Sequence, residues 1–218
     1  MNADSNRLSD MRVDYTRSQL NEDMMHNNPI VQFRTWFKEA LEFPVPEPNI
    51  MILSTAGSDG IPHARVVLLK DISDTGFTFY TNYESQKGRE IKQNNRVSLL
   101  FMWTEMQRQV RIEGLAEQLS EQEAIEYFNT RPLESQVGAT VSQQSEIIPN
   151  RDHLDQAFNK AMLDYKTGDK IPKPPYWGGY LVKPVLFEYW QGRANRLHDR
   201  LLYKMNELNN WTISRLSP

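Results

Sequence analysis

The stretch that decides the fold lies between residues 50 and 119, and it begins "IMILSTAGSDGIPHARVVLLKDI" (residues 50–72). It continues with "FTFYTN" (77–82), "RVSLLFMW" (96–103) and "RQVRIEGLAEQL" (108–119). Turns such as "GSDG" (57–60) and "SDTG" (73–76) separate these short runs of β-branched, aromatic and aliphatic residues. This pattern is typical of an antiparallel meander or barrel, and we expect a closed or nearly closed barrel.

Helices are predicted before, within and after this segment. The polar link "ESQKGREIKQNN" (84–95) separates two of the expected strands and is predicted to be helical. Three further helices are predicted from N-terminal capping signals, which are Asn28 followed by Pro29, the capping box of Ser120 with Glu123, and Asn150. We expect the helix that begins after Asn150 to end at Gly168. After residue 176 the chain returns to strands, with "YLVKPVLFEYW" (180–190) and "WTISRL" (211–216).

Strands and helices do not alternate regularly, which argues against a doubly wound parallel sheet. The predicted class is therefore mainly β with helices (α+β), and the predicted sheet is antiparallel. We expect one domain over residues 29–218, preceded by a polar, flexible N-terminal arm over residues 1–28.

Composition excludes several kinds of function. Lys and Arg number 25 and Asp and Glu 28, so the net charge is 25 − 28 = −3, too near neutral for bulk attraction to nucleic acid or an anionic membrane. The chain has no cysteine, and its four histidines show no metal-ligand spacing. No apolar run approaches the length of a membrane span. We expect no metal, no membrane segment and cytoplasmic residence.

Positive charge is concentrated near the C-terminus, in "RANRLHDR" (193–200). If residues 195–200 form a strand, its two-residue period places Arg196, His198 and Arg200 on one face, where they could hold an anion. A solvated edge strand that uses charge to prevent aggregation would explain the same letters. The flanking "FEYW" (187–190) and "LLY" (201–203) favour a lined pocket instead.

Three weaker signals point to bound phosphate. Arg65 and Lys70 lie at the two ends of an apolar strand. Because they are five residues apart, they fall on opposite faces of the strand unless it bulges. Lys87 begins the predicted helix 84–95, where free backbone N–H groups suit an anion. Tyr127 and Arg131 share a helical face and Ser135 follows, a set that could clamp a phosphate ester. Taken alone, Arg65 and Lys70 are better explained as strand-end charges that reach water, and a turn followed by a surface helix explains Lys87 as well. Each of the three signals is weak when it is taken singly.

Taken together and in order, these segments resemble the pyridoxine (pyridoxamine) 5′-phosphate oxidases over about residues 12–218. The motifs that carry the resemblance are "RVVLLK" (65–70), "FYTN" with "SQK" (79–87), "RQVRIEG" (108–114), "YFNTRP" (127–132), "SQVGA" with "SQQS" (135–145), "YWGGY" (176–180), and "FEYWQG" followed by "RLHDR" (187–200). The resemblance implies the FMN-binding split barrel, and a homodimer with FMN between its subunits.

The resemblance also assigns roles to residues. The positions that match FMN-binding residues are Arg65, Val66, Val67, Leu68, Leu69, Lys70, Tyr80, Thr81, Gln86, Lys87, Gln109, Gln144, Ser145, Trp190 and Arg200. Lys70 also matches the residue that binds the substrate phosphate, and we call Tyr127, Arg131 and Ser135, which match the rest of that site, the phosphate clamp. Arg196 and His198 match residues over the substrate ring, where they are the catalytic candidates. Arg12 and Tyr15 match a segment that can fold over the substrate.

Two positions depart from the family pattern. Gln86 stands where relatives commonly have Arg, which removes one cation from the FMN phosphate site. Arg193 stands where relatives often carry other residues, and it is assigned no role.

The activity that the resemblance implies is oxidation of pyridoxine or pyridoxamine 5′-phosphate to pyridoxal 5′-phosphate, with dioxygen as acceptor and hydrogen peroxide as product. One alternative is a related split-barrel flavoenzyme that acts on another heterocycle, such as a phenazine precursor. Another is a non-catalytic flavin or pyridoxal-phosphate binding protein, which would not need Arg196 and His198 facing the flavin. Nucleic-acid binding is disfavoured because the chain lacks both the charge and a basic, aromatic groove motif.

Overall fold

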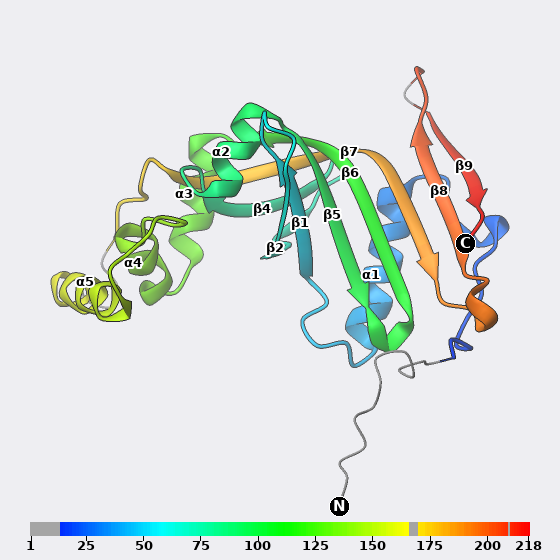
Figure 1. Ribbon diagram of the computed structural model, residues 1–218, viewed down its shortest axis with the longest axis horizontal. Helices are drawn as coiled ribbons and strands as arrows, with labels where there is room; N and C mark the ends of the chain where they lie inside the picture. Colours follow the sequence, from blue (N-terminus) through cyan, green and yellow to red (C-terminus); the bar gives the residue numbers. More distant parts are fainter. Residues whose placement is uncertain (1–13, 166–169, 209) are drawn as a thin grey trace, which may run out of the picture. The chain divides into compact units, whose positions relative to one another are not determined.

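The computed structural model describes residues 14–165, 170–208 and 210–218. Figure 1 shows the arrangement of the elements. The helices are α1 (Pro29–Glu42), α2 (Gln86–Gln93), α3 (Glu121–Thr130), α4 (Leu133–Val141) and α5 (Arg151–Asp164). The strands are β1 (Ile50–Ala56), β2 (Pro62–Leu68), β3 (Asp71–Ile72), β4 (Phe77–Asn82), β5 (Arg96–Trp103), β6 (Arg108–Gln118), β7 (Trp177–Gln191), β8 (Asp199–Met205) and β9 (Trp211–Leu216).

The strands form one sheet in the order β2-β1-β5-β6-β7-β4-β3, and β8 pairs with β7 and β9. The pairs β1–β2, β1–β5, β3–β4, β4–β7, β7–β8 and β8–β9 are antiparallel. A mainly antiparallel β fold with helices is thereby confirmed. The strand runs between residues 50 and 119 were recognisable because their turns are local and rich in Gly and Asp.

The expected helix starts are confirmed by their caps. The Asn28 side chain accepts a hydrogen bond from the backbone N–H of Ile30, and the Asn150 side chain accepts one from His153. Ser120 and Glu123 form the reciprocal capping box of α3. Such a cap contributes about 1 kcal/mol to helix stability. The last predicted helix, α5, ends at Asp164, and the expected end at Gly168 falls outside the described residues.

One expectation about local structure was wrong, and one helix was not predicted. Residues 195–198 are not a strand: Ala194–Arg196 form a 3₁₀ turn in which Asn195 and Arg196 have φ of 58° and 61°, and β8 begins only at Asp199. Arg196, His198 and Arg200 therefore do not share one strand face. The other difference is α4, which follows directly on Pro132 where no helix was predicted.

The chain divides into two compact units. The first comprises the described parts of residues 1–48, 101–111 and 186–218, and the second comprises residues 49–100 and 112–185. In the first unit, Phe33, Trp103, Tyr189 and Tyr203 are buried. In the second, Phe79, Phe128 and other large side chains are buried, so each unit has an apolar core of its own.

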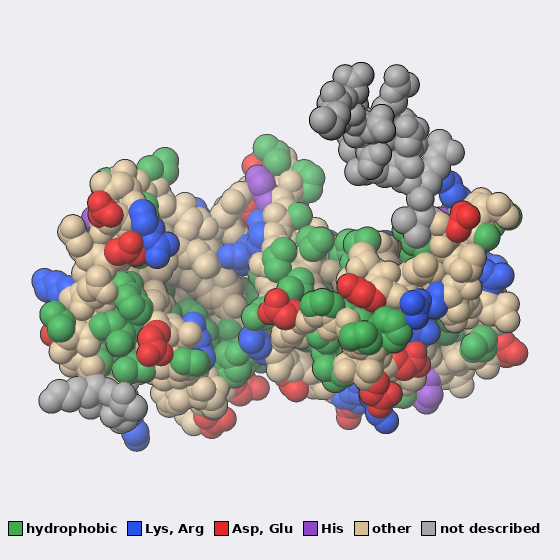
Figure 2. Space-filling model, turned by 90° about the horizontal axis from the view of Figure 1, so that it is seen from below, with side chains coloured by type: hydrophobic (Ala, Val, Ile, Leu, Met, Phe, Trp, Pro, Cys, Tyr) green, Lys and Arg blue, Asp and Glu red, His purple; other side chains and the backbone are tan. Residues whose placement is uncertain are grey.

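Charge is dispersed on one face of the molecule. On the face shown in Figure 2, acidic and basic side chains are interspersed. No helix among the described residues is both long and apolar enough to span a bilayer.

Candidate functional site

A cavity of about 860 Å³ in the second unit is lined by most of the predicted flavin and phosphate residues. Its volume is within the range of small-molecule sites. The predicted residues in its wall are Arg65, Val66, Val67, Leu68, Lys70, Tyr80, Thr81, Lys87, Tyr127, Arg131, Ser135 and Gln144. Asn82, Pro132, Gly138, Ala139, Ser142 and Trp177 complete the wall and had not been assigned a role.

Arg65 is held in the wall of this cavity by neighbouring strands. Its Nη1 donates to the carbonyl oxygens of Leu53 and His63 over 3.1 and 3.0 Å, and also to the Thr55 hydroxyl. Its Nη2 lies 3.3 Å from a carboxylate oxygen of Glu90, a residue of α2 that is 8% exposed. The guanidinium is therefore fixed before any ligand arrives.

Glu90 connects Arg65 to a second basic side chain. Nδ1 of His63 lies 2.8 Å from the other carboxylate oxygen of Glu90. Burial alone would raise the pKa of Glu90, but hydrogen bonds from Thr55 and Gln86 and the charges of His63 and Arg65 lower it. Glu90 thus remains an anion behind the cationic wall. Sequence reasoning missed it because a lone Glu in a polar helix looks like a solvated residue.

Lys87 is the most perturbed cation of the cavity. Its side chain is 8% exposed, and its ammonium lies 3.3 Å from Oγ of Ser85 and 3.0 Å from Oε1 of Gln144. Burial and the nearby charge of Arg65 lower its pKa to about 8. A buried ammonium beside a second cation favours a bound anion, because an anion would restore the ordinary pKa.

Arg131 is held by aromatic rings. Its guanidinium carbon lies 4.7 Å from the ring centroid of Trp177 and 5.5 Å from that of Phe128. Within the part of the chain that the structure describes, its buried Nη1 has no hydrogen-bond partner. Since unpaired buried donors are costly, this atom indicates a ligand that accepts a hydrogen bond there.

The junction of α3 and α4 positions the phosphate clamp. α3 ends at Thr130, Arg131 is its C-cap, Pro132 follows, and α4 carries Ser135 in its first turn. Lys70 lies beyond the end of β2, so the two-residue period of that strand does not reach it. Arg65 and Lys70 consequently line one cavity, whereas strand periodicity alone placed them on opposite faces.

Three of the predicted cofactor residues in the second unit do not line this cavity. Leu69 is buried, with 5% of its surface exposed. Gln86 is exposed, and its backbone N–H donates to Oγ of Ser145 over 3.2 Å. Ser145 has a φ of 77° and lines a neighbouring pocket with Gln143 and His153.

The first unit carries the remaining predicted residues. His198 lies between two aromatic rings, with centroid distances of 4.6 Å to Trp190 and 5.8 Å to Tyr15. Burial and the charge of Arg196 lower the pKa of His198. The structure thus brings Tyr15, Trp190 and His198 together, while the Arg196 side chain is exposed.

Arg200 is bound to a buried carboxylate. Its Nε donates to Glu188 over 2.7 Å, and Nη2 of Arg111 donates to the same carboxylate over 2.8 Å. Glu188 is 4% exposed, and it was missed although a single acid within an apolar strand is itself a signal of an ion pair. Gln109 lies half-buried on β6 of this unit, and Arg12 falls outside the described residues.

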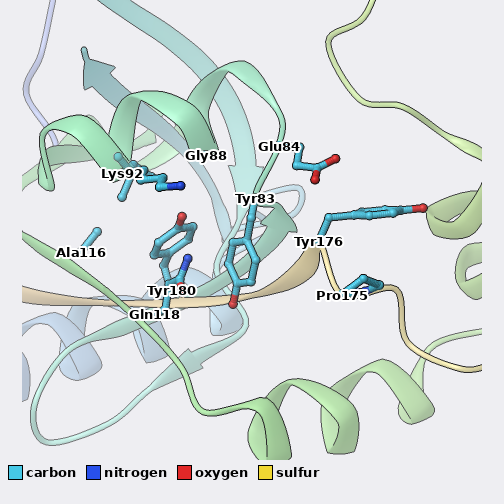
Figure 3. Close-up of a pocket in the computed structure, with 10 residues that line it drawn as sticks. Tyr83, Glu84, Gly88, Lys92, Ala116, Gln118, Pro175, Tyr176 and Tyr180 are labelled. Carbon is cyan, nitrogen blue, oxygen red and sulfur yellow. The ribbon is translucent and has the colours of Figure 1, made fainter. Parts of the chain in front are cut away.

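A second cavity of the second unit, of about 590 Å³, contains none of the predicted site residues. In Figure 3 the rings of Tyr83 and Tyr180 lie side by side, and Tyr176 extends away from both. No group of three or more metal-ligating side chains occurs among the described residues.

Comparison with known proteins adds evidence of ancestry. The family model described as pyridoxamine 5′-phosphate oxidase matches residues 37–162, and that of the pyridoxine 5′-phosphate oxidase C-terminal dimerisation region matches residues 177–218. Pyridoxine/pyridoxamine 5′-phosphate oxidase of Salinibacter ruber is 47% identical, covering 97% of this chain and 99% of its own length. The protein of that name from Cupriavidus taiwanensis is 49% identical with the same coverage.

Solved structures show the same fold. PhzG from Burkholderia lata, in complex with tetrahydrophenazine-1-carboxylic acid, has a TM-score of 0.85 and 31% identity, covering 91% of this chain and 98% of its own. A pyridoxamine 5′-phosphate oxidase-related, FMN-binding protein from Nostoc punctiforme has a TM-score of 0.68 and 19% identity, covering 85% and 97%. The predicted split-barrel class is therefore confirmed. Because one family model matches more than half of the chain and full-length relatives are nearly half identical to it, the chain belongs to the pyridoxamine 5′-phosphate oxidase family.

Proposed function

We propose that this protein is an FMN-dependent oxidase that forms pyridoxal 5′-phosphate. From pyridoxine 5′-phosphate, the alcohol and dioxygen give the aldehyde and hydrogen peroxide. From pyridoxamine 5′-phosphate, the amine, dioxygen and water give the aldehyde, ammonia and hydrogen peroxide. The observation that carries the proposal is the buried, unpartnered Nη1 of Arg131 in a cavity that Lys70 also lines.

The second-unit cavity fits the phosphate of FMN. Arg65 and Lys87 supply two cations, and the lowered pKa of Lys87 indicates an anion site whose charge is not yet balanced. The residues that hold FMN in this proposal are Arg65, Val66, Val67, Leu68, Leu69, Lys70, Tyr80, Thr81, Gln86, Lys87, Gln109, Gln144, Ser145, Trp190 and Arg200. When bound, FMN accepts a hydride from the substrate and passes the electrons to dioxygen.

The substrate phosphate binds to Lys70 and the phosphate clamp. Arg131 and Lys70 supply charge, and the hydroxyl groups of Tyr127 and Ser135 supply donors. Binding the phosphate fixes one end of the substrate and so orients the reacting carbon at the other end.

Arg196 and His198 act on the pyridine ring. His198 is neutral at pH 7, because its pKa is lowered, and it hydrogen-bonds the substrate. The cationic Arg196 positions the ring and favours the negative charge that develops in the site during hydride transfer. Arg12 and Tyr15 of the N-terminal arm, residues 1–28, close over the substrate.

The active assembly is a homodimer with FMN between its subunits. The match of residues 177–218 to a dimerisation region supports this assembly. Residues 29–218 function as one domain in each subunit, and cytoplasmic residence, with no membrane or nucleic-acid partner, is part of the proposal.

A second candidate is oxidation of another heterocycle, and the structural similarity to PhzG favours it. The two activities are separated by assaying oxygen consumption and peroxide release with pyridoxine 5′-phosphate, pyridoxamine 5′-phosphate and a tetrahydrophenazine carboxylic acid. We expect turnover with the two phosphorylated vitamers only. Turnover of the tetrahydrophenazine carboxylic acid alone would contradict our proposal and support the second candidate. If none of the three compounds gave peroxide, the protein would be a binding protein and not an oxidase.

A further inference from the structure

Trp177 contacts the phosphate clamp from a position that neither the sequence nor the family resemblance assigned to the site. It is the first residue of β7, 7% of its surface is exposed, and it lines the cavity that contains Arg131. The guanidinium carbon of Arg131 lies 4.7 Å from the centroid of its ring, within the range of a cation–π contact.

The same ring orders Tyr80 and Tyr127, and we call these three residues the aromatic stack. Tyr80 and Tyr127 lie with centroids 3.8 Å apart and planes 12° apart. Trp177 lies 5.4 Å from Tyr80 and 6.2 Å from Tyr127, with interplanar angles of 10° and 2°. The aromatic stack therefore joins a predicted cofactor residue, Tyr80, to a residue of the phosphate clamp, Tyr127.

The sequence "WGG" allows this arrangement. A Cβ atom on Gly179 would lie 2.8 Å from Cε1 of Tyr80, closer than side chains normally approach. The same Cβ atom would lie 2.6 Å from Cδ1 of Leu119, so any other residue at position 179 would displace Leu119, the Tyr80 ring or both. Gly179 thus leaves room for the Tyr80 ring of the aromatic stack.

An aromatic ring and a carboxylate would hold the Arg131 guanidinium with different effects on its N–H donors. In the described part of the chain no acidic side chain pairs with Arg131, and burial lowers its pKa. A carboxylate would occupy the N–H donors and cancel the charge, whereas the face of an indole attracts the cation and leaves its in-plane donors free. The unpartnered Nη1 of Arg131 is the result.

We infer that Trp177 is a positioning residue for the substrate phosphate: its indole face fixes the Arg131 guanidinium and the Tyr127 ring while keeping the donors of Arg131 available. This inference rests on the proposed function, since it requires a phosphorylated ligand in the cavity. It predicts that Trp177 determines preference for the phosphorylated substrate, without touching the reacting atoms.

The test compares three variants of the FMN-loaded protein. Trp177→Leu removes the ring, and Trp177→Phe keeps a smaller aromatic face. Tyr176→Phe is the matched control, because Tyr176 is the adjacent aromatic residue and its hydroxyl donates to the carbonyl oxygen of Thr140, 3.0 Å away, and not to the phosphate clamp. The probes are 4-deoxypyridoxine 5′-phosphate and 4-deoxypyridoxine, which lack the reacting group and differ only in the phosphate.

We expect Trp177→Leu to weaken binding of the phosphorylated probe by roughly tenfold, and Trp177→Phe by about threefold, which is the size of a partly desolvated cation–π contact. Binding of 4-deoxypyridoxine and of FMN should change less than twofold in every variant, and Tyr176→Phe should behave as wild type. In turnover assays the loss should appear in KM and not in kcat.

Three results would overturn the inference. One is wild-type affinity for the phosphorylated probe in both Trp177 variants. Another is an equal loss for both probes, which would make Trp177 a purely structural residue. Wild-type protein that does not distinguish the two probes would remove the phosphate site itself, and with it the proposed function. If only the inference about Trp177 is wrong, wild-type protein still prefers the phosphorylated probe. The failure of this inference can therefore be distinguished from the failure of the proposed function.

Discussion

The backbone N–H of Arg193 donates a hydrogen bond to Nδ1 of His198 over 3.1 Å. Nδ1 is therefore the acceptor nitrogen, and the hydrogen of the neutral ring lies on Nε2. Arg193, to which sequence reasoning gave no role, thus determines the tautomer of a catalytic candidate through its main chain. Its side chain ion-pairs with Asp199 over 3.1 Å, which secures the loop that makes this contact.

We predict that His198 is an Nε2–H tautomer whose pKa lies below that of an ordinary histidine. Burial and the charge of Arg196 lower its pKa, and protonation would remove the acceptor that Arg193 needs. Because the pKa of His198 is lower in the folded protein than in the unfolded chain, the unfolded chain takes up a proton first as the pH drops. The free energy of unfolding should therefore fall below about pH 6.5, the ordinary pKa of a histidine. Nitrogen-15 NMR of labelled histidine checks the tautomer, with His198→Gln to assign the signal. A titration midpoint above 6.5 would contradict the prediction.

FMN affinity should fall as the pH rises through 8. The pKa of Lys87 is about 8 in the free site, so above that pH binding of the phosphate must take up a proton. The affinity should then decline by up to about tenfold per pH unit. Flavin fluorescence quenching measures it between pH 6.5 and 9.5.

Two controls belong to this experiment. Riboflavin has no phosphate, so its affinity should not show the decline. Lys87→Arg keeps its charge at every pH tested and should flatten the FMN profile. The same decline in Lys87→Arg as in wild type would assign the titration to another group.

Removing a cation from the phosphate site should act on KM. In Arg131→Ala and Lys70→Ala we expect KM for pyridoxine 5′-phosphate to rise by roughly tenfold or more, with a smaller change in kcat, because phosphate contacts bind ground and transition states alike. Steady-state kinetics of FMN-saturated protein provide the measurement. Unchanged KM in both variants would place the substrate phosphate elsewhere.

Arg196→Met should fold and retain FMN but lose most turnover. The Arg196 side chain is exposed, so we expect its replacement to leave the core packing intact. We expect the flavin spectrum and the melting temperature to match wild type while kcat falls by about 100-fold or more, as for loss of a group that stabilises developing charge. Normal kcat/KM in Arg196→Met would remove Arg196 from the mechanism.

Glu188→Ala should destabilise the protein by about 3 kcal/mol, because it leaves two arginines without the buried carboxylate that they share. Glu117→Ala is the control: Glu117 pairs with Lys183 at a site where both side chains are about half exposed, and its loss should cost less than about 1 kcal/mol. Urea denaturation monitored by tryptophan fluorescence compares the two. Equal losses would show that Glu188 is not a buried anchor.

Strands and helix caps were predictable because their signals are local. The alternation of residues 50–119 and the caps at Asn28, Ser120 and Asn150 each lie within a few residues of the structure that they specify. The turn at Ala194–Arg196 was not predictable in this way. Two consecutive non-glycine residues with positive φ are held by surrounding contacts, such as the one between Arg193 and His198, which no periodicity reveals.

The candidate site was predicted through motifs, and the residues that support it were not. Glu90, Trp177 and Glu188 act on Arg65, Arg131 and Arg200 by contacts that join separate elements. Sequence spacing carries no record of such contacts. The exposed position of Lys70 shows the same limit: β2 ends at Leu68, so strand periodicity does not indicate whether Arg65 and Lys70 share a cavity.

The measurement that tests the central claim most directly is the colour of the protein under anaerobic addition of pyridoxine 5′-phosphate. The account predicts a yellow protein, as purified or after reconstitution with FMN, which bleaches when the phosphorylated vitamer is added and regains its colour in air. Protein that cannot be reconstituted with FMN, or a yellow holoprotein that keeps its colour with both vitamers, would contradict the account.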